Sequence, residues 1–196
     1  IITGSGSANT LNGNTYATWN GNNFALRGGE GENCTIELAS DEGDDNGDFW
    51  RMMAQASDNA LAIDHYGTGS WVERLRINSS GGVLIGTTTV GNSDADDLTI
   101  ANSAHAGITL RSGTSSQGAI YFSDATSGAA QYDGFLGYNQ SDRAMFFGTA
   151  QATRVRIDSS GRLLIGTSSV GQDDADNLTI DGSGEGTGRT GITIRS

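Results

Sequence analysis

The sequence predicts an all-β protein made of repeated modules of short strands and hairpins, and three observations support this fold class. Short segments in which apolar and polar residues alternate recur at even intervals, with Gly, Asn, Asp and Ser between them. One hairpin-like motif occurs twice, at positions 74–86 and 154–166. No segment of about 11 or more residues keeps the 3.6-residue apolar period that identifies an amphipathic helix.

The repeated motif reads RLRINSSGGVLIG in its first copy and RVRIDSSGRLLIG in its second. In each copy an alternating strand leads into a polar Ser-Ser-Gly turn, and a short apolar strand follows. Because successive side chains of a strand point to opposite faces, the arginines and the aliphatic residues of the first strand should lie on opposite sides. Both copies therefore predict a β-hairpin.

The remaining strand predictions follow the same pattern along the chain. Residues 1–23 are rich in Gly, Ser, Asn and Thr and predict loops or short strands. Before the first hairpin, strands are predicted at 24–27, 34–38, 49–55, 60–63 and 71–77. After it, strands are predicted at 98–100, 108–110, 119–122, 135–138 and 144–147.

The repeat extends beyond the hairpin. Residues 90–100 recur at 170–180 with the same 80-residue offset, and residues 57–61 have a weaker counterpart at 141–145. Repeats of this kind generate length, and their surplus residues go into surface loops. An elongated molecule is therefore expected.

These matches divide the sequence into three parts. We expect the end of a preceding module at 1–77, with a Gly- and Asn-rich N-terminal part, then a complete module at 78–157 and a truncated next module at 158–196. The segment at 107–112 recurs at the last six residues, 191–196. We therefore expect the chain to be a window of a longer repetitive polypeptide.

The composition supplies few residues for a core. Leu, Ile, Val and Phe account for 37 of the 196 residues, and the formal net charge is −12, a combination that is common in disordered chains. The regular strand pattern argues against disorder. We therefore expect identical chains to pool their apolar residues, because one chain alone would bury too little to offset about 1–2 kcal/mol of backbone entropy per residue.

Several classes of partner are excluded by the same composition. All eleven basic residues are Arg and the pI is about 4.3, which leaves no basic footprint for a nucleic-acid backbone. Cys34 is the only cysteine, so no disulfide within the chain stabilises the fold. No run approaches the roughly 18 apolar residues of a membrane span, and no signal peptide is visible.

The Arg-x-Arg-Ile-Asn/Asp-Ser-Ser-Gly motif, followed by its Leu-Ile-Gly-Thr strand and preceded by the strand pair at 138–147, resembles a repeat of tail fibres and other appendage proteins of tailed bacteriophages. The resemblance covers most of residues 48–196, and such repeats are frequent in phages of aquatic bacteria, cyanophages among them. It implies a fibrous parallel homotrimer, a β-prism or a triple β-helix-like shaft. In that family the modules often lie upstream of an intramolecular chaperone domain. Similar repeats occur in bacterial surface proteins.

Nucleotide and metal sites find little support. A Walker loop needs a Lys that the chain lacks, and the Gly-rich stretch at 182–188 misses the dinucleotide-binding spacing. Zinc would have to use Cys34, His65 and His105, whose spacing is unsuitable. Calcium has two candidate places. The stretch containing Glu42, Asp44, Asn46 and Gly47 begins like an EF-hand loop, but Met53 stands where the bidentate Glu belongs.

The second candidate for calcium is a repeated pair of aspartates, Asp94 with Asp96 and Asp174 with Asp176. These residues also suit solvated turns, which is the interpretation we favour. Trp50, Tyr66 and Trp71 suit either a core or sugar stacking, and the core is favoured. No catalytic residue, no cofactor and no metal ligand is predicted.

The Arg-x-Arg pairs of the hairpins allow two interpretations. Arg74, Arg76, Arg154 and Arg156 could pair with carboxylates of a neighbouring chain, or they could form a solvated basic face of little energetic value. No pair of the many carboxylates stands out for glycoside hydrolysis, and no nucleophile elbow occurs.

Taken together, the sequence predicts a non-enzymatic shaft segment of a phage tail fibre, located in the virion and outside the cell. Its expected partners are two further copies of itself, other virion tail proteins, and a host receptor or glycan that a distal region contacts. A carbohydrate-cleaving tailspike and a bacterial extracellular filament or adhesin are the alternatives.

Overall fold

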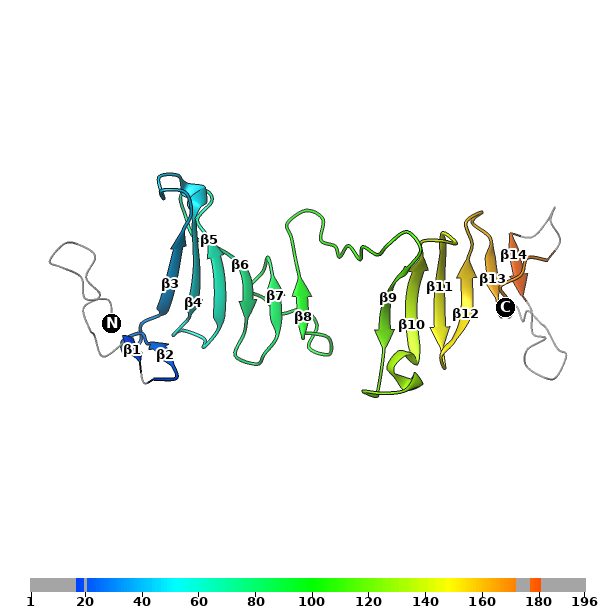
Figure 1. Cartoon of the computed structure of the whole chain (residues 1–196), viewed down its shortest axis with the longest axis horizontal. Coiled ribbons are helices and arrows are strands. Elements are labelled where there is room, and N and C mark those ends of the chain that lie inside the picture. Colours follow the sequence, from blue (N-terminus) through cyan, green and yellow to red (C-terminus); the bar gives the residue numbers. More distant parts are fainter. Residues whose placement is uncertain (1–16, 20, 172–176, 181–196) are drawn as a thin grey trace, which may run out of the picture. The chain divides into compact units, whose positions relative to one another are not determined.

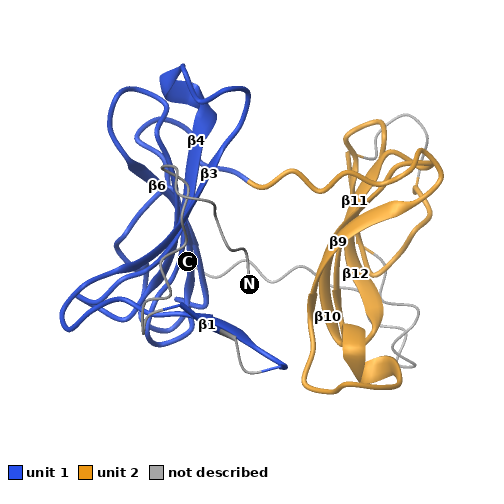
Figure 2. Ribbon diagram, turned by 60° about the vertical axis from the view of Figure 1, so that its left-hand side comes forward, with its two compact units in different colours: residues 1–107 blue, residues 108–196 orange. Residues whose placement is uncertain are grey.

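The computed structural model describes residues 17–19, 21–171 and 177–180, and it is all-β with two short 3-10 helices. The chain divides into two compact units, residues 1–107 and residues 108–196 (Figure 2). Each unit contains one six-stranded sheet, in which the strands follow one another in chain order (Figure 1). The predicted fold class is thus confirmed at the level of an all-β protein.

The first unit begins with a two-stranded sheet of β1 (Ala17–Trp19) and β2 (Phe24–Leu26). Its six-stranded sheet, called sheet 1 here, then runs without interruption through five antiparallel strands, and the final pair, β7 and β8, is parallel. A 3-10 helix, η1 (Asn46–Asp48), lies in the connection between β3 and β4. The strands are β3 (Cys34–Ala39), β4 (Phe49–Ala54), β5 (Leu61–His65), β6 (Val72–Ile77), β7 (Val83–Ile85) and β8 (Leu98–Ile100).

The second unit contains sheet 2, which has the same plan. Its strands are also antiparallel until the last pair, which is parallel. The third and fourth strands of both sheets carry a register shift at the same place, after Ile63 in sheet 1 and after Phe147 in sheet 2. The elements are β9 (Gln117–Phe122), η2 (Ala129–Tyr132), β10 (Gly134–Asn139), β11 (Ala144–Thr149), β12 (Ala152–Ile157), β13 (Leu163–Ile165) and β14 (Leu178–Ile180).

The strand registers give each residue of sheet 1 a counterpart in sheet 2. Arg76 lies between Ala62 and Leu84, and Arg156 lies between Phe146 and Leu164. The word counterpart is used below for such equivalent positions. Because the final strand pair is parallel, a connection has to cross one face of each sheet to reach β8 and β14.

Both predicted hairpins are present, as β6 with β7 and as β12 with β13. Their turns share one mechanism. The Oδ1 atom of Asn78, or of its counterpart Asp158, accepts hydrogen bonds at 2.8 to 3.0 Å from the backbone N–H groups two and four residues on. Gly81 and Gly161 have φ values of +93° and +82°, which a residue without a Cβ adopts at low cost.

One strand prediction differs from the structure, because residues 108–110 form no strand. The three-residue strand β1 agrees with the loops or short strands expected in residues 1–23. The other predicted strands are confirmed, with ends that differ by one or two residues. The two sheets divide the chain at 107/108. The module boundaries drawn at 77/78 and 157/158 fall inside the two hairpins, at the ends of β6 and β12.

Each sheet has one buried face and one exposed face, and the core is thin. Among the described residues only Leu84 and Leu164 are large side chains with almost no exposure. The loop after β7 passes over the buried face, where the N–H of Gly91 donates to Oγ1 of Thr99 at 3.0 Å. The apolar residues of the core are Met53, Ala60, Ala62, Leu84, Ala144, Phe146 and Leu164. In the described part of the chain, no helix is long and apolar enough to cross a membrane.

Candidate functional site

The exposed face of sheet 1, called apolar face 1, consists almost wholly of apolar side chains. One row across the sheet runs through Ile36, Met52, Ile63, Leu75 and Ile85 into β8. These positions alternate with those of the buried face, as strand geometry requires. The remaining members are Cys34, Leu38, Trp50, Ala54, Leu61, His65, Val72, Ile77, Val83, Leu98 and Ile100.

The described residues of its own unit leave this face uncovered. Leu38 is 59% exposed, Leu98 is 51% exposed and Ile36 is 43% exposed. His65 is the only member that can carry a charge, and its ring stacks on Trp50 at 4.5 Å between centroids. A contiguous apolar surface of this kind on a soluble protein marks a contact surface for another molecule.

Apolar face 2, the counterpart in sheet 2, has the same character. Its central row runs through Ile120, Leu136, Phe147, Val155 and Ile165. Ile120 and Phe147 are both exposed, and no acidic or basic residue stands at any paired position of this face. The other members are Gly118, Phe122, Gly134, Tyr138, Met145, Thr149, Ala152, Ile157, Leu163, Leu178 and Ile180. Both sheets thus present one apolar face without Asp, Glu or Arg at any paired position, in matching register.

The opposite face of sheet 1, called polar face 1, is organised around Arg76. Its Nε and Nη2 atoms donate to the two carboxylate oxygens of Glu73 at 2.8 and 2.9 Å. Nη2 also donates to Oε1 of Gln55 at 2.6 Å, and Nη1 donates to Asp58. The hydrogen bond to Glu73, opposed by burial, and the further bond to Asp58 raise the pKa of the Arg76 guanidinium above its ordinary value.

A second ion pair lies beside the first. Arg51 Nε donates to Oδ2 of Asp64 at 2.6 Å, and the Asp64 side chain is almost fully buried. The Arg51 guanidinium also lies 4.4 Å from the ring centroid of Trp71. Trp71 in turn contacts Tyr66 at 5.2 Å between centroids. These contacts hold both rings within their own unit, but Tyr66 and Trp71 are only half-buried and neither belongs to the core, so the predicted core role is not met.

The third predicted aromatic, Trp50, behaves differently. Its side chain is 42% exposed and belongs to apolar face 1. The preference for a core position is therefore not met within one chain. A core position for Trp50 would require a partner that covers this face.

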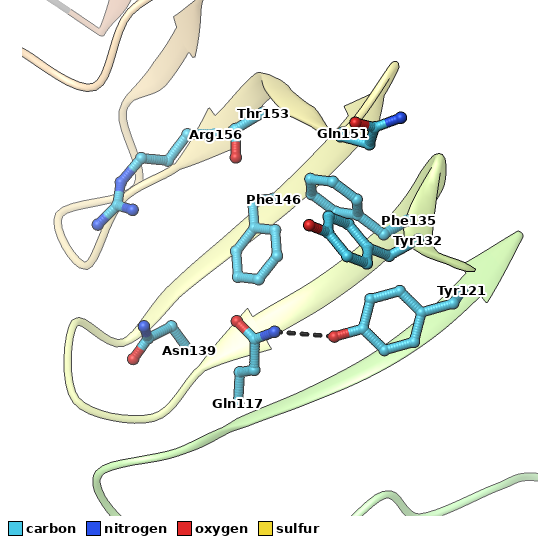
Figure 3. Close-up of a pocket in the computed structure, with 9 residues that line it drawn as sticks. All are labelled: Gln117, Tyr121, Tyr132, Phe135, Asn139, Phe146, Gln151, Thr153 and Arg156. Carbon is cyan, nitrogen blue, oxygen red and sulfur yellow. Dashed lines mark hydrogen bonds between the residues drawn. The ribbon is translucent and has the colours of Figure 1, made fainter. Parts of the chain in front are cut away.

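Polar face 2, the counterpart in sheet 2, contains an open pocket of about 470 Å³ (Figure 3). Aromatic rings form one part of its wall, amide groups form another, and Arg156 lies at its side. The amide of Gln117 donates to the hydroxyl of Tyr121 at 3.0 Å. The described lining residues are Gln117, Tyr121, Tyr132, Phe135, Asn139, Phe146, Gln151, Thr153 and Arg156.

Three charged residues of sheet 1 are replaced by uncharged residues at the counterpart positions of polar face 2. Glu73, Arg51 and Asp64 of sheet 1 have as counterparts Thr153, Phe135 and Gly148. The ring of Phe135 lies over Gly148, where any Cβ would overlap it. Three charged side chains of polar face 1 are thereby exchanged for a phenyl ring, a short hydroxyl side chain and a glycine over which that ring lies.

The structure gives Arg76 a role that neither interpretation foresaw. Arg76 was expected either to pair with a neighbouring chain or to be solvated, but it is buried and paired inside its own sheet. Arg156 pairs with Asp142 of its own unit at 3.3 Å, and Arg154 donates to the Thr149 carbonyl at 3.3 Å. Arg74 is exposed. Arg76 and Arg156, the third residues of the two motifs, lie on the face opposite to the aliphatic side chains, as the alternation predicted. That face is the better buried one.

The metal candidates are dispersed. His65 Nε2 lies 3.1 Å from the Gly47 carbonyl, while Cys34 and His105 belong to other segments. The N–H of Asp94 donates to Asn92 Oδ1 at 2.8 Å, which is an ordinary turn contact. Asp48 Oδ2 accepts from the Asp45 N–H at 3.0 Å and caps η1 in the EF-like stretch. Among the described residues, no three His, Cys, Asp or Glu side chains gather as a metal site would require.

The remaining candidates at Asp174, Asp176 and residues 182–188 lie outside the described residues. The pocket of polar face 2 was missed by sequence reasoning, although its strands were predicted. A signal was present in the repeat: the arginine motif recurs, but Glu73 becomes Thr153 while Asp58 remains acidic as Asp142. A comparison of the two modules at these positions would have shown an arginine that had lost one of its acids.

No protein-family model matches the chain, and no match was found among curated proteins.

Proposed function

We propose that this chain is a structural segment of a phage tail-fibre shaft in which three copies pack in parallel with their apolar faces turned inward. The observation that carries the proposal is the pair of apolar faces, one on each six-stranded sheet. Burial of one Leu, Ile, Phe or Met side chain contributes about 1.5–3 kcal/mol. Each face has ten such positions and therefore strongly favours a partner.

A second copy of the same chain suits these faces better than an unrelated partner. The two faces have the same strand order and the same register shift. A partner that covers both faces has to present two apolar surfaces that repeat along the partner as the two faces repeat along this chain. Identical chains in parallel register satisfy that requirement at every module, and the same contact can continue along further modules. The number three rests on the resemblance to tail-fibre repeats.

In this proposal the charged groups remain on the outside. Arg76, Glu73 and Asp58 belong to polar face 1, and the net charge of −12 keeps an elongated assembly soluble. The mechanical task is to hold a distal receptor-binding region away from the virion. The partners are then two further copies, other virion tail proteins, and a host receptor or glycan bound elsewhere on the fibre.

An antibody against residues 1–196, used for immunogold electron microscopy, tests this function. On virions of the phage that encodes the chain, we expect gold along the fibres between the particle and their tips. Gold on filaments of bacterial cells without phage would favour the bacterial-filament alternative. Release of sugar from host polysaccharide by the purified chain would favour the tailspike alternative.

A further inference from the structure

We propose that the pocket on polar face 2 is a binding site for a sugar residue that carries a carboxylate, such as a hexuronate. The pocket is formed by β9, β10, β11 and β12 together with η2, all within the second unit (Figure 3). Its volume of about 470 Å³ lies in the range of small-molecule sites. A single chain therefore supplies all the described lining residues.

The argument for a carboxylate comes from the two counterpart arginines. In sheet 1, Nε and Nη2 of Arg76 hold the carboxylate of Glu73 at two points. In sheet 2, Thr153 replaces Glu73 and lines the pocket. Among the described residues, Arg156 donates only to Asp142, through Nη2 at 3.3 Å. A guanidinium presents a planar fork that matches a carboxylate, so a ligand carboxylate would take the place that Glu73 fills in sheet 1.

The argument for a sugar comes from the rest of the lining. Tyr121 and Tyr132 are 49% and 42% exposed, so both offer ring surface to an apolar face of a ligand. The amide groups of Gln117, Asn139 and Gln151 stand around the same pocket. Amides donate and accept, which suits a set of hydroxyl groups. A ligand that matches this lining has a flat apolar surface, several hydroxyl groups and one carboxylate. A uronic acid has all three.

The same lining indicates binding without cleavage. Glycoside hydrolysis needs two carboxyl groups that flank the scissile bond, and the nine described lining residues contain none. Two acids that contact lining residues are already paired, because Asp142 binds Arg156 and Asp133 accepts from the amide of Gln151 at 2.9 Å. The pocket also lies on the face opposite to apolar face 2, so packing through the apolar faces leaves it open to solvent.

Isothermal titration of the full chain with sodium glucuronate tests the proposal, with methyl glucoside as the uncharged sugar and benzoate as the acid without hydroxyls. We expect glucuronate to bind with a Kd on the order of 1 mM and both comparison ligands to bind about 10-fold more weakly or not at all. Thr153→Glu restores the acid of sheet 1 beside Arg156 and should abolish binding. Arg156→Gln should weaken glucuronate binding about 10-fold and leave methyl glucoside unchanged.

Ser168→Glu is the matched control, because it adds the same charge at an exposed position outside the pocket. The affinity of this variant for glucuronate should equal that of the parent. Far-ultraviolet circular dichroism and melting curves establish that each variant is folded. Equal affinity for glucuronate and methyl glucoside would contradict the proposed contact between Arg156 and the ligand carboxylate. Tighter binding of benzoate than of glucuronate would contradict the proposal that the ligand is a sugar. Absence of glucuronate binding at 20-fold above the expected Kd, or unchanged binding by folded Thr153→Glu, would overturn the site itself.

Discussion

The guanidinium of Arg76 and the carboxylate of Glu73 form a two-point ion pair, with Nε 2.8 Å from Oε1 and Nη2 2.9 Å from Oε2. Both side chains are at most 15% exposed, so the pair is largely withdrawn from water. The counterpart positions in sheet 2 hold Arg156 and Thr153, and there the arginine keeps one acid at 3.3 Å. One sequence motif therefore supports two different local structures.

Removal of the guanidinium should accordingly cost far more in sheet 1 than in sheet 2. Arg76→Gln leaves Glu73 as a largely buried carboxylate without its cation, and the free energy of unfolding should fall by about 3–5 kcal/mol. Arg156→Gln, the matched change, should cost about 1 kcal/mol or less. Urea unfolding at fixed chain concentration measures both values. Tryptophan emission reports unit 1, because all three tryptophans precede residue 108. An equal fall in the free energy of unfolding for the two variants would show that the burial of Arg76 does not contribute to stability.

The turn at Asp158 should make sheet 2 sensitive to acid. Burial tends to raise the pKa of this carboxyl, but hydrogen bonds from the backbone of Arg162, its guanidinium and the N–H of Ser160 outweigh burial and hold the pKa below 3.8. A depressed pKa means that the stabilisation is present above the unfolded pKa and is lost as the pH falls through the folded value.

Asp158→Asn keeps the Oδ1 acceptor, as Asn78 does in the first hairpin, and removes the titration. Its melting temperature should therefore fall less than that of the parent between about pH 5 and pH 2. Asn78→Asp is the reciprocal control. It should introduce a smaller acid dependence, because Gly82 supplies a backbone N–H but no guanidinium. Parallel pH profiles of Asp158→Asn and the parent would contradict this account.

Arg143 and its counterpart Asn59 occupy the same left-handed backbone position, with φ values of +52° and +57°. Asn tolerates this region better than Arg does. Arg143→Asn should raise the free energy of unfolding by up to about 1 kcal/mol, and Asn59→Arg should lower it by a similar amount. Chemical unfolding followed by circular dichroism measures both. A loss of stability in Arg143→Asn would mean that the arginine side chain contributes a contact that outweighs the backbone strain.

Gly148 gives Phe135 the space for its ring. Gly148→Ala places a Cβ inside that ring, so Phe135 has to move, and the cost should be about 1–3 kcal/mol. Gly107→Ala adds the same methyl group where no atom lies within 4 Å and φ is not positive, and its stability should be nearly unchanged. Thermal unfolding distinguishes the two variants. A melting temperature of Gly148→Ala equal to that of the parent would show that the ring of Phe135 is not held in this place.

The sequence predicted the strands well because their pattern is local. Alternation at residues 74–77, glycine turns and the Ser-Ser-Gly motif act over a few residues. Residues 108–110 alternate in the same way without forming a strand, and no segment in the described part of the chain pairs with them. Periodicity indicates that a segment can be a strand, and hydrogen-bonding partners decide whether it becomes one.

The sites could not be predicted because they depend on contacts across strands. Arg76 obtains Asp58 from the loop between β4 and β5 and Gln55 from the end of β4, each 18 or more residues away. The strand pattern alone left this arginine either paired with a neighbouring chain or solvated, and it did not indicate partners within its own sheet. The pocket depends on Phe135 turning over Gly148, which becomes visible only when β10 and β11 are paired in register.

Sedimentation equilibrium of the purified chain tests the central claim, that the apolar faces pack against identical copies. Two variants distinguish the apolar face from the rest of the sheet. Ile36→Glu places a charge on apolar face 1, and Thr35→Glu places the same charge on the opposite side of the same strand. Both positions are exposed in the single chain, so neither change should unfold a monomer. We expect three times the chain mass of 20.3 kDa for the parent and for Thr35→Glu, with Ile36→Glu shifted toward smaller species. A folded monomer at all concentrations, or the same assembly for Ile36→Glu as for the parent, would contradict the account.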